Sequence, residues 1–144
     1  MRTGITLVIL ISSLSTCFSQ MQSVEVTEEF VDCRGKETKF LLLKGFKKKV
    51  LSYTDGIFYY FTSLDSSMFV VHCGGMHQIP LLQGREYQIT RTENKGRQGT
   101  KNDTNLYWRE LNLGSINIYY DHIKSDKKEY FDKLLEALTE EMRK

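Results

Sequence analysis

The chain has 144 residues, of which 20 are Lys or Arg and 18 are Asp or Glu, so its formal net charge is +2. A charge this close to zero excludes the strongly basic surface of a nucleic-acid-binding protein. The length predicts one domain with a single hydrophobic core.

Residues 1–19 have the order of a secretory signal peptide. Arg2 precedes an apolar run at 5–11, and small residues at Cys17 and Ser19 lead to a cleavage site after Ser19. The run is shorter than the roughly twenty apolar residues that cross a bilayer, and no later segment reaches that length. We therefore predict a secreted, extracellular protein without a membrane span, with one mature domain at 20–144.

Removal of this leader leaves two cysteines, Cys33 and Cys73. An oxidising compartment favours a disulfide between them. Such a bond closes a loop of about forty residues and restricts the unfolded chain by ~4 kcal/mol. We expect it to tie the amino-terminal segment to the middle of the fold.

From Val24 onward, apolar and polar residues alternate, β-branched and aromatic residues are frequent, and turn residues recur at short spacing. This pattern predicts a mainly β fold of six to eight antiparallel strands, forming a curled sheet or a small barrel. In chain order, the expected strand segments are 24–33, 40–43, 50–54, 57–61, 68–73, 86–90, 106–108 and 116–120. Residues 79–82 contain Pro80, which predicts an edge strand or a connection.

Two connections are predicted from their turn residues. Asp55 and Gly56 separate two alternating runs and tolerate the positive φ of a type I′ turn, so we expect a tight hairpin there. The strand at 57–61 is apolar on both faces, which predicts a central position. Residues 93–104 are all polar or glycine and form the longest expected loop.

After residue 124 the apolar period changes from two to three and four, which is typical of an amphipathic helix. We predict one C-terminal helix at about 125–143, packed on the sheet. Asp126 and Glu129 have the spacing of a capping box at its start. Its apolar stripe consists of Phe131, Leu134, Leu135, Leu138 and Met142.

The histidines are the candidates for metal binding or catalysis. His72 and His77 flank Cys73, but a disulfide-bonded cysteine supplies no thiolate and two histidines are an incomplete zinc set, so we expect no metal or other cofactor. His122 follows Asp121, yet neighbours in an extended strand point to opposite faces, so we expect the two not to pair. No serine elbow accompanies them, and we predict that the protein is not an enzyme.

Two surface features have alternative interpretations. The basic cluster at Lys44, Lys47, Lys48 and Lys49 indicates either a protected edge strand or a weak contact with glycosaminoglycans. Asn102 begins an Asn-Asp-Thr acceptor sequence in the polar loop, and we expect it to carry a glycan.

Aromatic residues make up 12% of the chain. They serve either as core and cross-strand partners or as the lining of an apolar pocket. The lining candidates are Tyr59, Phe61, Tyr87, Trp108 and Tyr120. We therefore expect a secreted, non-enzymatic binding protein that carries a small apolar ligand in a cleft or binds an extracellular protein through an aromatic and basic surface. The alternatives are an extracellular protease inhibitor and a small secreted hydrolase with a histidine-containing cleft.

Overall fold

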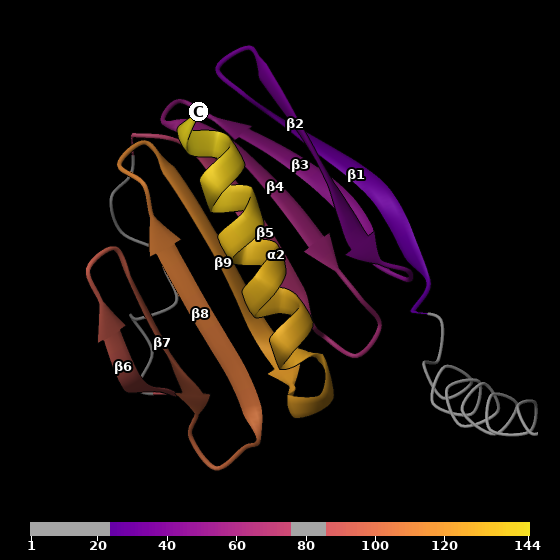
Figure 1. Cartoon of the computed structure of the whole chain (residues 1–144), viewed down its shortest axis with the longest axis vertical. Coiled ribbons are helices and arrows are strands. Elements are labelled where there is room, and N and C mark those ends of the chain that lie inside the picture. Colours follow the sequence, from indigo (N-terminus) through magenta and orange to yellow (C-terminus); the bar gives the residue numbers. More distant parts are fainter. Residues whose placement is uncertain (1–23, 76–85) are drawn as a thin grey trace, which may run out of the picture.

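The structure is a computed structural model that describes residues 24–75 and 86–144. The predicted signal peptide at 1–19, and the predictions for His77 and 79–82, lie outside these residues. The described chain forms nine strands and one helix (Figure 1). The elements are β1 (Val26–Cys33), β2 (Lys36–Leu43), β3 (Lys47–Tyr53), β4 (Gly56–Thr62), β5 (Met68–Gly74), β6 (Tyr87–Glu93), β7 (Gly96–Lys101), β8 (Leu106–Asn112), β9 (Ile116–Lys124) and α2 (Ser125–Arg143).

Seven strands form one antiparallel sheet in the order β3-β4-β5-β9-β8-β7-β6, and β1 and β2 form a separate hairpin. The prediction of a mainly β fold with a C-terminal helix is confirmed, with nine described strands in place of six to eight. Because β3 and β6 are the two edges and do not pair with each other, the sheet is open and curled and does not close into a barrel.

Helix α2 lies lengthwise on one face of the sheet, against β9 and β8 and beside β2 (Figure 1). We call this the inner face. Its core joins strand residues such as Phe69 and Ile118 to Phe131 and Leu135 of the helix, all of them 0% exposed. A smaller cluster packs on the outer face around Phe58, Val70 and Tyr119. The predicted apolar stripe of the helix therefore faces the sheet.

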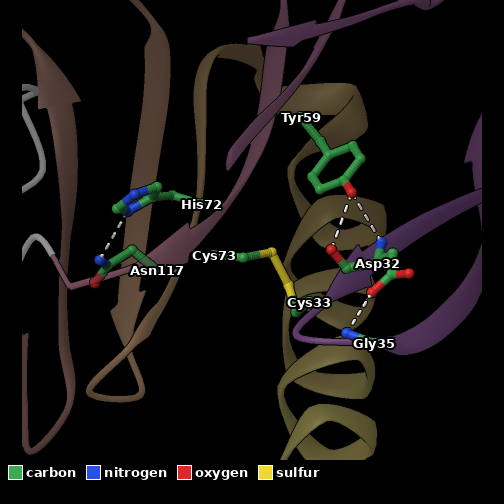
Figure 2. Close-up of a disulfide and its surroundings, with 7 residues drawn as sticks. All are labelled: Asp32, Cys33, Gly35, Tyr59, His72, Cys73 and Asn117. Atoms are coloured by element: carbon green, nitrogen blue, oxygen red, sulfur yellow. Dashed lines mark hydrogen bonds between the residues drawn. A yellow bond between two sulfur atoms is a disulfide. The ribbon is translucent and has the colours of Figure 1, made fainter. Parts of the chain in front are cut away.

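The β1–β2 hairpin covers the inner face beside α2 (Figure 1). The predicted disulfide is present: Cys33 and Cys73 join the hairpin to β5 with a Cα–Cα distance of 5.3 Å (Figure 2). The Tyr59 hydroxyl donates to the Asp32 carbonyl at 2.9 Å and accepts from the Asp32 amide at 3.2 Å. On the other side, the Tyr130 hydroxyl donates to the Leu41 carbonyl at 2.7 Å. Side chains thus satisfy backbone groups at both outer edges of the hairpin.

The hairpin predicted around Asp55 is confirmed, but its turn lies one residue earlier. Tyr53 pairs with Gly56, so Thr54 and Asp55 are the turn residues. Gly56 has φ 150°, and a Cβ there would lie 2.3 Å from the Cys73 carbonyl oxygen. This position therefore needs glycine because β5 approaches closely.

Two further predictions are wrong. The expected loop at 93–104 contains strand β7, which is polar and uses Gly99 where a Cβ would lie 1.7 Å from the Gln88 carbonyl oxygen. The expected capping box is absent as well: the N-cap is Lys124, and it makes no side-chain cap hydrogen bond. Asp126 lies within the first turn, where its charge suits the helix dipole.

Candidate functional site

A groove of about 1170 Å³ opens on the inner face between α2 and the strands β6, β7 and β8. We call it the polar groove. It exists because α2 lies over the centre of the sheet and leaves the β6–β7 hairpin uncovered (Figure 1). The side chains of this hairpin that face the groove are polar. Gln98 on β7 lies opposite Arg109 on β8, and Glu93 on β6 lies opposite Gly96 on β7.

Arg109 lies at the floor of the polar groove with its side chain only 8% exposed. Its Nη1 atom lies 3.0 Å from both Asp132 and Glu136, which are one turn apart on α2. Its Nη2 atom lies 3.2 Å from Glu93 on β6. One guanidinium therefore joins the helix to the edge of the sheet. Its charge-assisted hydrogen bonds fix the positions of these groups relative to one another.

Asp132 is the second fixed charge of this cluster. Its carboxylate accepts hydrogen bonds from the Tyr120 hydroxyl at 2.8 Å and from Lys128 at 2.5 Å, in addition to Arg109. Burial acts to raise the pKa of Asp132, but the bonds from Lys128, Tyr120 and Arg109 outweigh burial and hold the pKa below its ordinary value. Burial raises the pKa of the Tyr120 hydroxyl, and its hydrogen bond to Asp132 raises this pKa further.

Two buried polar atoms in the groove lining have no hydrogen-bond partner in the described part of the chain. They are Nε of Arg109 and Oγ1 of Thr139, whose residues are 7% and 5% exposed. Native proteins leave few such atoms unsatisfied, so each requires an explanation.

Three cations at the rim of the groove differ from Arg109 in having little or no charge partner. Arg91 is 68% exposed and lies 3.6 Å from Glu93. Lys95 and Arg143 are exposed and form no ion pair within 4.0 Å among the described residues.

The five predicted lining residues lie on two faces of the sheet and do not form one cavity. Phe61 and Tyr120 are 0% exposed, and with Tyr59 they belong to the inner core. Tyr87 and Trp108 pack against each other on the outer face, with ring centroids 5.7 Å apart. Each of these side chains has its packing partners within the fold.

The lysine cluster lies on and before β3, which is an edge strand. Lys44 bonds to Glu25 at 2.8 Å. Lys48 donates to the Phe30 carbonyl, and its Nζ lies 3.8 Å from the centre of the Phe30 ring. Lys47 and Lys49 are exposed on β3, as expected of a strand edge protected by charge.

The described histidines have different environments. His72 is buried on the outer face, stacks on Phe58 with centroids 4.0 Å apart, and lies 3.4 Å from the Asn117 amide (Figure 2). Burial lowers its pKa. These contacts describe a packed histidine of the outer cluster.

The prediction that Asp121 and His122 do not pair is wrong. The register of β8 and β9 shifts between Tyr107 and Arg109, and His122 takes φ 57° in the resulting bulge. The strand is not extended at this point, so Nδ1 of His122 lies 3.0 Å from the Asp121 carboxylate.

Two further side chains complete this polar cluster. Lys101 Nζ lies 2.7 Å from Nε2 of His122, and the Tyr87 hydroxyl donates to Asp121 at 2.6 Å. Burial raises the pKa of the Tyr87 hydroxyl, and the hydrogen bond to the negatively charged Asp121 raises this pKa further. The imidazole of His122 therefore lies between the Asp121 carboxylate on its Nδ1 side and the Lys101 ammonium on its Nε2 side.

A second cavity is apolar. A cleft of about 570 Å³ lies between β2 and α2 and is lined chiefly by Phe40, Leu41, Leu134, Ala137 and Leu138. We call it the apolar cleft.

Asn102 lies in the exposed turn between β7 and β8, where an attached glycan would meet solvent.

Within the ranges that the structure describes, no helix is long and apolar enough to span a bilayer. Nor do three or more His, Cys, Asp or Glu side chains group there in a way that could hold a metal ion. The chain matches no protein-family model, no curated protein and no solved structure.

Sequence reasoning did not identify the Arg109 cluster. Asp132 and Glu136 at a spacing of four gave a signal for one charged helix face, but their partner Arg109 comes from a strand. Only the topology places that strand beneath the helix.

Proposed function

We propose that this chain is a secreted, non-enzymatic binding protein and that the polar groove is where it binds a protein partner. The observation that carries the proposal is the uncovered polar half of the inner face, with Arg109 fixed at its floor and exposed cations at its rim. A disulfide is typical of proteins in oxidising compartments, which supports secretion.

The size and lining of the polar groove favour a polypeptide over a small molecule. Its volume of about 1170 Å³ exceeds the roughly 300–1,000 Å³ of small-molecule pockets, which are mostly apolar. Guanidinium donors and carboxylate acceptors both line this groove, and a peptide backbone offers both acceptors and donors to match them.

The apolar cleft favours a second candidate, the carriage of a small apolar ligand. Leu41 at its rim is 54% exposed, and the cleft has the size of a small-molecule site. The two candidates place the ligand on opposite flanks of α2, so one experiment can separate them.

The chain offers two positions for an added glycan, one next to the polar groove and one in the apolar cleft. Thr90→Asn makes residues 90–92 an Asn-Arg-Thr acceptor beside Arg91 of the polar groove, and Ala137→Asn makes 137–139 an Asn-Leu-Thr acceptor in the apolar cleft. Thr90 and Ala137 are both exposed. The full chain and both variants are expressed in insect cells, purified from the medium, and checked for the added glycan by mass spectrometry.

Random peptides displayed on phage are then selected on the wild-type chain and tested on both glycosylated variants. We expect enriched peptides to bind the wild type and the Ala137→Asn variant and to lose binding to the Thr90→Asn variant. Peptides that bind the Thr90→Asn variant equally well would refute the polar groove as the site. A small apolar ligand retained in native mass spectra, and displaced in Ala137→Asn, would favour the carrier function.

A further inference from the structure

We infer that the polar groove selects an acidic segment of its protein partner, whose carboxylates pair with Arg91, Lys95 and Arg143 and whose acceptor atoms reach Arg109 and Thr139. This inference rests on the proposed function and adds the chemistry of the partner.

The first step is the distribution of uncommitted charge. The carboxylates of Glu93 and Asp132 already accept from Arg109, and Asp132 also accepts from Lys128. By contrast, the exposed cations at the rim keep most of their hydrogen-bonding capacity. The groove is lined by five cations and four carboxylates, so the charges leave a small positive excess, and an approaching partner meets it at the rim cations.

The second step is the unsatisfied donors at the floor. Nε of Arg109 can only donate, and the hydroxyl of Thr139 can donate as well. Both atoms are buried without a partner in the described chain. A buried donor left unsatisfied is costly, so an occupant whose binding shifts the lining and brings an acceptor to either atom gains more here than on an ordinary surface.

The third step separates an acidic polypeptide from a sulfated glycan, which also carries anions. Glu136 is 62% exposed beside Arg109, and Glu140 also lines the groove. These carboxylates repel a continuous polyanion, but they accept hydrogen bonds from the amides of a peptide backbone. Spaced acidic side chains on a polypeptide fit this mixed lining.

The test uses the enriched phage peptides as synthetic, fluorescently labelled probes, with affinity measured by anisotropy. Lys95→Glu with Arg143→Glu reverses two rim charges. The matched control is Lys39→Glu with Lys133→Glu, which makes the same charge change at the apolar cleft, where both lysines form only exposed ion pairs. We expect acidic residues to be enriched in the selected peptides and the rim variant to weaken their binding at least about tenfold, with less than about twofold change in the control.

A third variant tests the floor. Thr139→Val keeps the shape of the side chain and removes a hydroxyl that has no partner in the free chain. We expect it to weaken peptide binding about fivefold without lowering the stability of the free protein. A loss of binding accompanied by a loss of stability would instead indicate a structural role for the hydroxyl and refute this step.

The outcomes distinguish this inference from the proposed function. Basic or apolar peptides that still require an open polar groove would overturn the acidic partner and leave the proposed function standing. Peptides that bind the Thr90→Asn glycoform, or no enrichment at all, would overturn both. Retention on immobilised heparin that the rim variant abolishes, without acidic peptides in the selection, would assign the rim cations to a glycan and overturn the inference.

Discussion

On the inner face, the half of the sheet formed by β3, β4, β5 and β9 contrasts with the half formed by β8, β7 and β6. The first half presents Phe61, Phe69 and Ile118, which are 0% exposed beneath α2 and the β1–β2 hairpin. The second half presents Arg109 and Gln98 to an open groove. The antiparallel pairing is the same in both halves. The halves differ in whether α2 and the β1–β2 hairpin lie over them, and their inner side chains are apolar or polar accordingly.

This contrast implies that stability and binding are assigned to different parts of one sheet. Buried apolar surface stabilises the covered half by about 25 cal/mol per Å². In the uncovered half, β8 is anchored to the core through Leu111, and the β6–β7 hairpin beyond it is held by its backbone ladder and the Arg109 cluster. Its side chains are therefore available for a partner, and the predictions below separate these two roles.

The largest expected effect is the loss of the cover itself. Replacing Cys33 and Cys73 by serine removes a bond across a sequence separation of 40 residues, and loop entropy predicts a free energy of unfolding lower by about 4 kcal/mol. Urea unfolding measures the loss, and hydrogen exchange shows whether β1 and β2 exchange first. A loss below about 1 kcal/mol would mean that the side-chain bonds alone hold the hairpin.

Truncation in each half gives the next contrast. Phe131→Ala empties a site packed against Phe69 and Tyr120, with ring centroids about 6 Å away, and is expected to lower the free energy of unfolding by about 3 to 4 kcal/mol. Gln98→Ala in the polar groove is expected to change it by less than about 0.5 kcal/mol. Equal losses in urea unfolding would contradict the division between the halves.

Arg109 joins the two halves, and its removal has an intermediate effect. Arg109→Met leaves Glu93 and Asp132 without their shared partner, although Glu136 is 62% exposed and regains water. We expect a loss of about 2 kcal/mol, less than for a fully buried pair. Arg91→Met, at a position 68% exposed, serves as the control and should cost less than about 0.5 kcal/mol.

Sequence patterns predicted the covered half better than the uncovered one, for a physical reason. The alternation at Ile57, Tyr59 and Phe61 reports burial, because a core stands on that face. In β7 no core covers the inner face, and the polar run around Gly99 carries no such alternation. The polar sequence of β7 therefore predicts a loop, whereas its uncovered neighbour β6 retains Tyr87 and Ile89 in alternation and is predicted as a strand at 86–90.

The candidate site was less predictable than the fold. The disulfide followed from cysteine counting, but the Arg109 cluster depends on which strand lies beneath α2, and this is a property of strand order. The bulge at His122 likewise depends on the register between β8 and β9. Such register choices do not alter composition or periodicity enough to be detected in one sequence.

The smallest expected effect is an acid dependence of the cluster that joins the halves. The pKa of Asp132 is lower in the folded chain than the unfolded value of about 3.9. Its contribution to stability is therefore complete above that value and is lost as the pH falls through the lowered folded pKa. Because Asp132 retains some exposure, we expect Asp132→Asn to cost about 1 kcal/mol at neutral pH and to flatten the stability profile below about pH 4. Asp65, whose pKa is also lowered, chiefly by hydrogen bonds from Ser63 and Lys127 in the β4–β5 turn, remains in this variant and should leave a residual slope. An unchanged profile in urea unfolding across this pH range would mean that the pKa of this carboxylate is the same in the folded and the unfolded chain, and that the cluster does not hold the uncovered half to the helix.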